Sequence, residues 1–282
     1  MIQINKTVLA DLARGFQIPS PPDILTQIQG ECATDDADIN QIAQLIASDI
    51  GLSSGILKTI NSPLYGMNRV VSDIQQAVMM LGINAVSTLI SGLLIRQSFK
   101  GEAVISFERL WDNARLVAET MVYIGQNIEF KIPPENLYST GLFHDCGIAA
   151  MSMRYPDYRE ILMDANCNYE QTQVEIEDAR YNTNHAVVGY FIASSWALPK
   201  DICQVILNHH ELDYLDHHHQ NGTDLVYAAL KAAENMVNEI KRRTPAPDWP
   251  RISDACHMTL GISENDYRDL LEDLDEQWNA AF

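Results

Sequence analysis

Apolar residues recur along this chain at intervals of three and four, the spacing that places side chains on one face of an α-helix. Residues 38–49 illustrate the pattern, with an apolar face made of Ile39, Ile42, Leu45 and Ile46. No segment alternates apolar and polar residues for long enough to predict a half-buried β-strand. The pattern therefore predicts an all-α protein.

The same periodicity, together with turn-forming residues, sets the predicted helix boundaries. Ser72 is predicted to cap a helix that ends at Gly82, because Gln75 follows three residues later, as in a capping box. No helix is expected to cross residues 244–250, because three of these seven residues are proline. Further helices are expected at 21–33, 51–61, 83–99, 106–128, 135–153, 157–166, 169–181, 184–197, 200–210, 224–242 and 264–279.

Breaks in the pattern predict two packed lobes rather than two independent domains. The predicted joint is the Lys-Gly-Glu segment at residues 100–102. We expect an N-terminal helical lobe at 1–102 and a larger helical lobe at 103–243. Residues 244–282 then form a proline-rich break followed by an acidic C-terminal helix.

The net charge of the chain limits which classes of partner it is expected to bind. The 282 residues include 19 Lys and Arg against 38 Asp and Glu, a formal net charge of −19. A nucleic-acid binder needs clustered basic side chains, and the one basic run here is Lys241, Arg242 and Arg243. We therefore expect no nucleic-acid partner. The acidic helix at 264–279 presents either a solvated polar face or a docking surface for a basic protein partner.

The sequence predicts neither a membrane-spanning helix nor a signal peptide for secretion. The most apolar stretch, residues 85–95, is far shorter than the ~20 apolar residues of a membrane-spanning helix. The start of the chain does not have the charged and apolar regions of a signal peptide. The five cysteines are scattered and form no CxxC pair, which favours reduced thiols. We expect a cytoplasmic protein.

Histidines supply the strongest chemical signal. His144 is followed directly by Asp145, and neighbouring residues on a helix point about 100° apart. Both side chains can therefore reach one metal ion only near a bend or a helix end. His185 and His209 lie on later predicted helices that could fold back toward this pair. Imidazole and carboxylate together suit Fe, Mn, Zn or Ni, although a buried structural histidine is the simpler alternative for His144.

Four stretches of the chain resemble the HDOD proteins, the HD-related output domains of bacterial signalling. The two most specific elements are Asn-Ser-x-x-Tyr-Gly, at residues 61–66, and Ala-x-x-x-Leu-Gly, at residues 77–82. The resemblance covers about 16–215. The stretches are 18–22 (IPSPP), 48–52 (SDIGL) with 60–66 (INSPLYG), 74–82 (IQQAVMMLG) and 141–147 (GLFHDCG), extended by 184–189, 196–199 and 209–210.

HDOD proteins are similar to the HD and HD-GYP metal-dependent phosphohydrolases. This similarity implies a two-lobed helical fold with an HD-like C-terminal bundle. It also implies a set of metal ligands, which here would be His144, Asp145, His185, His209, His210 and Glu234. Glu234 follows Ala233 where an Ala-Asp pair is usual, so its carboxylate is one methylene longer. Asn113 stands where active relatives have the first ligand, a histidine, and an amide oxygen is a poor substitute.

Three functions remain open on this evidence. The first is a signal-transduction output module with a degenerate HD-type site, which binds a protein partner or small ligand without turnover. The second is a metal-dependent phosphohydrolase acting on a nucleotide or phosphoester, with a metal-bound hydroxide as nucleophile; across the three functions the divalent metal is present, partly bound or absent. The third is a scaffold whose histidines are core residues. An acidic chain argues against a polyanionic substrate, because few basic residues lie near the candidate ligands: Arg115, Arg154, Arg180 and Lys200.

Overall fold

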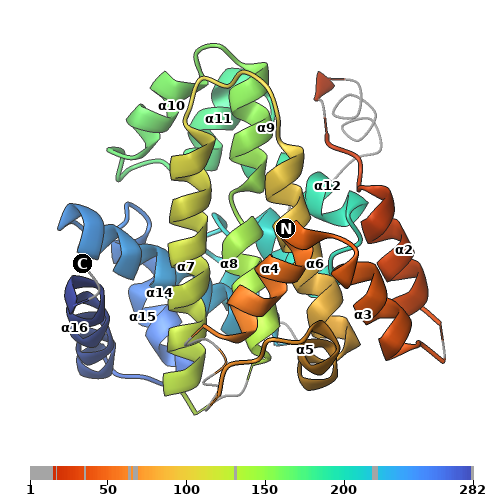
Figure 1. Cartoon of the computed structure of the whole chain (residues 1–282). Helices are drawn as coiled ribbons and strands as arrows, with labels where there is room; N and C mark the ends of the chain where they lie inside the picture. The colour runs from red at the N-terminus through yellow and green to blue at the C-terminus, as the bar shows by residue number, and fades with distance from the viewer. Residues whose placement is uncertain are drawn as a thin grey trace.

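The computed structural model describes residues 15–16, 18–34, 36–62, 65, 69–129, 132–217 and 222–280. In these residues the chain is built from α-helices and short connections, with no β-strand (Figure 1). The prediction of an all-α fold is confirmed. Three residues of the segment at 61–66, namely Pro63, Leu64 and Gly66, lie outside the described residues.

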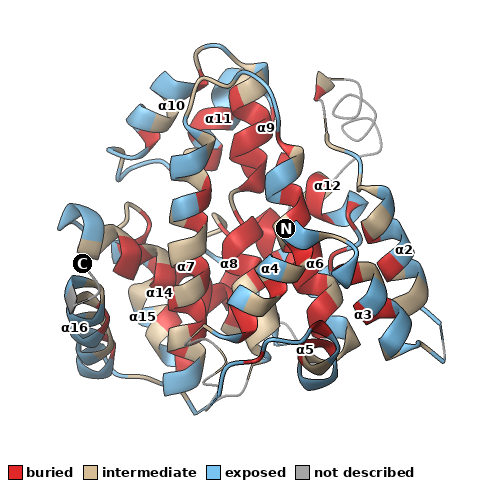
Figure 2. Cartoon of the chain, in the orientation of Figure 1, coloured by how far each residue is buried: buried red, intermediate tan, exposed pale blue. Residues whose placement is uncertain are grey.

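The first helices surround α6, whose side chains are largely buried (Figure 2). Their apolar faces meet through completely buried side chains such as Leu25, Ile42 and Ile56. Burying each of these side chains contributes about 1.5–3 kcal/mol of hydrophobic stabilisation. The helices are α2 (Asp23–Cys32), α3 (Ile39–Ala47), α4 (Ile50–Ile60), α5 (Ile74–Leu81) and α6 (Ile83–Ser98).

The remaining helices form a larger bundle in which α7 packs against α8 and α14. Helix α9 packs against α12, and α12 packs against α13. The elements are α7 (Phe107–Asn127), α8 (Pro134–Phe143), α9 (Cys146–Arg154), α10 (Tyr158–Ala165), α11 (Gln173–Tyr181), α12 (His185–Ser195), α13 (Lys200–Asn208), the 3₁₀ turn η2 (Tyr214–His217), α14 (Thr223–Arg242), α15 (Trp249–Leu260) and α16 (Glu264–Ala280).

Two departures from the predicted helices concern α9 and α15. The helix expected at 135–153 is broken at His144 and Asp145, where Asp145 has φ −98° and ψ 11° before α9 begins. Neither residue at the break is a glycine or a proline, so the local sequence does not predict it. Helix α15 was not predicted; it begins at Trp249, within the stretch 244–250 that no helix was expected to cross, and ends at Leu260. Proline is tolerated in the first turn, where its missing N–H has no intrahelical partner.

Gly82 ends α5 and begins the turn into α6, as predicted. Its φ of 81° lies in the left-handed region, which glycine adopts without steric cost. No single helix in the described ranges is long and apolar enough to cross a membrane. Helices α5 and α6 pass such a test only as a pair, and they are bent by 115° relative to each other.

A tryptophan joins the two predicted lobes. Trp196 is completely buried at the end of α12, and its indole N–H donates a 2.8 Å hydrogen bond to the carbonyl oxygen of Pro19. In return, the side-chain amide of Gln29 on α2 donates a 2.8 Å hydrogen bond to the carbonyl oxygen of Trp196. One apolar core includes side chains from both sides of residue 102. The lobes are therefore packed together, and the division at 102 stays a prediction.

The N-cap of α5 is Asp73, not the predicted Ser72. The Asp73 carboxylate accepts a 2.7 Å hydrogen bond from the backbone N–H of Gln76. We expect Asp73→Ala to lower the free energy of unfolding by about 1 kcal/mol, because this N–H has no other partner within the first turn. Ser72→Ala is the matched control and should change it by less than about 0.5 kcal/mol. Urea denaturation followed by circular dichroism measures both; equal losses would contradict the assignment.

Candidate metal centre

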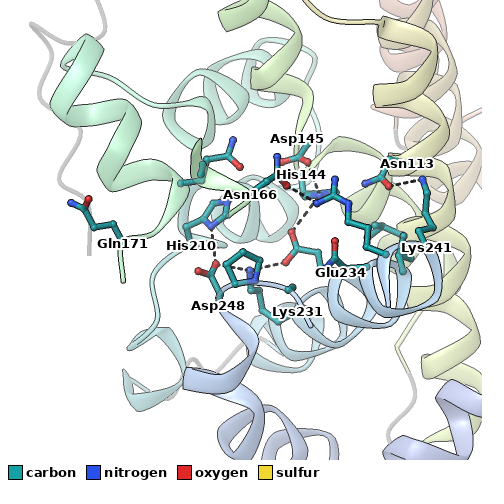
Figure 3. Close-up of a pocket in the computed structure, with 18 residues that line it drawn as sticks. Asn113, His144, Asp145, Asn166, Gln171, His210, Lys231, Glu234, Lys241 and Asp248 are labelled. Atoms are coloured by element: carbon teal, nitrogen blue, oxygen red, sulfur yellow. Dashed lines mark hydrogen bonds and ion pairs between the residues drawn. The ribbon is translucent and has the colours of Figure 1, made fainter. Parts of the chain in front are cut away.

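A pocket opens where the break between α8 and α9 faces α14. Figure 3 shows His144 and Asp145 on one side of it, with Lys231 and Glu234 projecting toward them from α14. The start of α12 and the end of α13 contribute the remaining histidines. The structure therefore brings together residues that are far apart in the sequence, since Glu234 is numbered 90 above His144.

The break between α8 and α9 is held in place by close helix packing. A Cβ atom added at Gly147 would lie 1.9 Å from the carbonyl oxygen of His185 and 2.7 Å from the backbone nitrogen of Gly189. Only a residue without a side chain allows α9 and α12 to approach this closely. The contact places His185, the first residue of α12, beside Asp145 at the start of α9.

Two of the histidines have their ring orientation set by backbone carbonyl groups. Nδ1 of His144 lies 2.7 Å from the carbonyl oxygen of Gly141, and Nδ1 of His209 lies 2.8 Å from that of Ile206. A carbonyl oxygen only accepts hydrogen bonds, so each Nδ1 must carry the proton. Nε2 of each ring is left facing the centre of the site, which is how metal-ligating histidines are oriented.

His185 is held by Glu177, a residue that sequence reasoning missed. The Glu177 side chain is completely buried, and its Oε2 lies 2.8 Å from Nδ1 and 2.7 Å from the backbone nitrogen of His185. Its Oε1 accepts a 2.6 Å hydrogen bond from the Tyr158 hydroxyl and a 2.9 Å bond from Gln173. One signal was available in the sequence: Glu177 follows Val174 by three positions and therefore lies on the same, buried face of the helix.

The Nε2 atoms converge on Asp145. Nε2 of His185 and Nε2 of His209 lie 3.2 Å apart, and Oδ1 of Asp145 is 3.5 Å and 3.7 Å from them. The other carboxylate oxygen, Oδ2, is 3.2 Å from Nε2 of His144. Two nitrogen lone pairs this close repel each other unless a proton or a cation is shared between them. The donor set therefore fits a metal ion.

His210 completes a group of three histidines. One ligand atom from each of His185, His209 and His210 lies within 4.8 Å of the other two, so the three could hold a metal ion. Nδ1 of His210 is 3.0 Å from the Asp248 carboxylate, which supports this ring as Glu177 supports His185. Asp248 lies in the proline-rich stretch, and sequence reasoning did not connect it to the site.

The buried charges shift the pKa values of these side chains in different directions. Burial alone would lower the pKa of His144, but the neighbouring Asp145 and Glu234 carboxylates raise it to about 9. Burial and the adjacent His210 lower the pKa of His209 to about 3. His209 is therefore neutral at pH 7, the form in which imidazole binds a metal. The histidines also hold the pKa of Asp145 well below its usual value, against the effect of burial.

The other half of the site is built differently. Asn113 lines the pocket from α7, and its Oδ1 accepts a 3.1 Å hydrogen bond from the Lys241 ammonium. Oε1 of Glu234 is 3.5 Å from Nε2 of His144, while Oε2 is 2.7 Å from the ammonium of Lys231. The carboxylate of Glu234 is thus shared between a histidine and a lysine.

The pocket is more basic than the sequence predicted. Its cations are Lys231, Lys241 and Arg242, all on α14. The four basic residues expected near the ligands, Arg115, Arg154, Arg180 and Lys200, are not among the lining residues. Spacing on α14 was the missed signal, since positions 231, 234, 238 and 241 recur on one helical face. Overall negative charge therefore does not exclude an anionic ligand from this pocket.

The fold and the site define a family. The HDOD domain model matches residues 18–212, so the chain belongs to the HDOD family. This confirms the resemblance inferred from the motifs. The match ends just after His210 and therefore includes every candidate ligand except Glu234.

Solved structures share the fold over nearly the whole chain. An HDOD domain protein of unknown function from Geobacter sulfurreducens is 25% identical, with a TM-score of 0.67, and the match covers 97% of this chain and 94% of that one. A candidate metal-dependent phosphohydrolase from Shewanella amazonensis is 17% identical, with a TM-score of 0.64 and 96% of each chain covered. At that identity the second match supports the fold alone.

A relative of known sequence is longer than this chain. An uncharacterized protein from Treponema pallidum is 24% identical over 252 residues. The match covers 88% of this chain but 48% of the relative, so the chain spans about half the length of that protein.

Proposed function

We propose that the chain is a signal-transduction output module whose HD-type site binds a metal ion and a small anionic ligand without hydrolysing it. A protein partner in the signalling pathway would respond to the occupied site. Membership of the HDOD family, whose proteins the sequence resemblance identifies as output domains of bacterial signalling, supports the signalling role. The observation that carries the absence of turnover is the contact between Asn113 and Lys241.

Asn113 stands where active relatives of the HD superfamily have a ligand histidine. Its amide oxygen is a weak donor to a transition metal, and here it already accepts a hydrogen bond from a positively charged lysine. A metal ion beside that ammonium would meet both a poor ligand and a like charge. Two-metal phosphohydrolysis uses ions about 3.5–4 Å apart, so losing one position removes that mechanism.

The metal ion would be held by Asp145 and the three clustered histidines, His185, His209 and His210. An imidazole-rich set with one carboxylate suits Fe, Mn, Zn or Ni. When bound, such an ion would supply a Lewis acid that attracts an anionic group of the ligand. Lys241 and Arg242 line the same pocket and would steer negative charge toward it.

Metal-dependent phosphohydrolysis is the second candidate function. It is favoured by the arrangement of Asp145, whose Oδ1 faces His185 and His209 while Oδ2 faces His144. With one oxygen in each group of donors, Asp145 would help to hold two metal ions, which would stabilise the attacking and leaving oxygens of a phosphoester. Lys241 and Arg242, which line the same pocket, would then bind the phosphate of a nucleotide or phosphoester.

A hydrolysis assay separates the two functions. After reconstitution with Mn²⁺, Fe²⁺, Zn²⁺ or Ni²⁺, we expect the chain to bind metal but to cleave bis(4-nitrophenyl) phosphate and a panel of cyclic nucleotides no faster than His144→Ala does. The reason is the incomplete Asn113 half of the site. A wild-type rate about a hundredfold above that of His144→Ala would instead establish the phosphohydrolase. Failure to bind any of the four metals would favour the scaffold reading.

A further inference from the structure

Lys231 is a buried lysine inside the candidate metal centre. Its side chain is 5% exposed, and its ammonium lies 2.7 Å from Glu234 Oε2 and 3.3 Å from Asp248 Oδ2 (Figure 3). An ammonium removed from water costs several kcal/mol unless it is paired. Burial alone would lower the pKa of Lys231, but the two carboxylates outweigh it and raise the pKa, so the side chain is charged.

The two partners of Lys231 connect it to opposite sides of the site. Glu234 reaches His144 through its other oxygen, at 3.5 Å from Nε2. Asp248 lies 3.0 Å from Nδ1 of His210 with the same oxygen that faces Lys231. The ammonium therefore sits beside the His144 half of the site, and it also fixes the carboxylate that orients one histidine of the other half.

This position is one that a cation would otherwise have to fill. The Glu234 side chain is 17% exposed and lies against His144, and a carboxylate so largely removed from water needs a positive partner. In a two-metal site that partner is an ion, whereas here Lys231 on the same helix supplies it from three residues away. A divalent ion at this point would lie next to the positive charge of Lys231. The repulsion between the two would be strong, because little water is present to screen it.

We propose that Lys231 takes the place of a second metal ion: its ammonium neutralises Glu234, and the chain binds one divalent ion, at Asp145, His185, His209 and His210. Glu234 is then a partner of lysine rather than a metal ligand, which revises the expectation drawn from the sequence. Through Asp248, the same ammonium positions His210. This inference rests on the proposed function in assuming that the histidine half binds metal.

The test counts bound Mn²⁺ in the full chain. Apo protein is equilibrated with MnCl₂, freed of excess metal, and analysed by inductively coupled plasma mass spectrometry and by electron paramagnetic resonance. We expect about one Mn²⁺ per wild-type chain and about two per chain of the Asn113→His/Lys231→Met double variant, which regains the missing histidine ligand and loses the ammonium; only this variant should show the spin-coupled signal of a metal pair. Asn113→His/Lys241→Met is the matched control, because Lys241 is on the same helix and lines the same pocket but bonds to Asn113; it should stay at one.

Two results with the folded Asn113→His/Lys231→Met protein would overturn the proposal. A count that stays at one means that the lysine does not exclude the second ion. A count that falls to zero means that the lysine only supports the histidine half. Circular dichroism establishes that each variant is folded.

Asn113→His alone keeps the proposal testable if the double variant does not fold. Asn113 is partly exposed, so a histidine can be accommodated there. With Lys231 intact we expect this variant to bind one Mn²⁺, although it restores the missing ligand; two ions would overturn the proposal. These counts do not depend on turnover. Hydrolysis by the wild-type chain would contradict the proposed function. A Mn²⁺ count that stays at one after Lys231 is replaced would contradict only the inference about Lys231.

Discussion

Gly147→Ala is expected to lower the free energy of unfolding by about 3 kcal/mol or more, the upper end for overpacking a protein core. The new Cβ would lie 1.9 Å from the carbonyl oxygen of His185 and 2.7 Å from the backbone nitrogen of Gly189. Both are backbone atoms, so no side-chain rotation relieves the clash. Helices α9 and α12 must separate, and His185 would move away from Asp145. We expect metal binding to weaken together with stability.

Gly30→Ala is the matched control for this substitution. Gly30 lies within α2 on an exposed part of the helix, and a Cβ added there would meet nothing within 4 Å. Alanine costs less backbone entropy than glycine inside a helix, so this variant should gain about 0.5–1 kcal/mol. Urea denaturation monitored at 222 nm compares the two. If Gly147→Ala unfolds at the wild-type midpoint, the close packing of α9 on α12 is not required.

Much of the helical framework followed from local sequence because periodicity and end signals are local. Helix α6 begins and ends within one residue of the range predicted from its apolar pattern. The argument that His144 and Asp145 meet one site only near a bend is consistent with the break found there. The break itself was not predicted. It depends on α12 packing against Gly147, a contact between residues 38 or more positions apart.

The supporting residues of the site could not be predicted for the same physical reason. Glu177 and Asp248 matter because folding places them against the rings of His185 and His210. The neighbourhood of Asp248 does not distinguish it from a surface acid, and the helical spacing of Glu177 from Val174 indicates burial but not a histidine partner. Lys231 is similar, since an (i, i+3) pair with Glu234 normally indicates an exposed helix face. In the folded chain, however, this face of α14 lies toward the pocket. The resemblance to HDOD proteins supplied the histidine positions but none of these partners.

Glu177→Gln is expected to weaken metal binding about 10- to 100-fold, the usual effect of removing the partner that orients a metal-ligating histidine. Glutamine has nearly the same shape but replaces one acceptor oxygen with an NH₂ group. Four donors now converge on the two oxygens: the backbone N–H and Nδ1 of His185, the Tyr158 hydroxyl and the Gln173 amide. With glutamine, the proton of His185 is no longer held on Nδ1. It can move to Nε2, the atom that faces His209 and Asp145.

Asp178→Asn separates this effect from the simple loss of a charge. Asp178 is the next residue on α11, and its carboxylate accepts hydrogen bonds from the side chain of Asn184 rather than from a histidine. Competition with a chelator gives the Mn²⁺ dissociation constant of each variant, and ¹⁵N NMR of the imidazole rings reports which nitrogen of His185 carries the proton. We expect Asp178→Asn to stay within about threefold of the wild-type constant, because it leaves the proton on Nδ1. Equal losses in the two variants would mean that Glu177 acts through its charge alone, and an unchanged constant in Glu177→Gln would mean that His185 does not bind the metal.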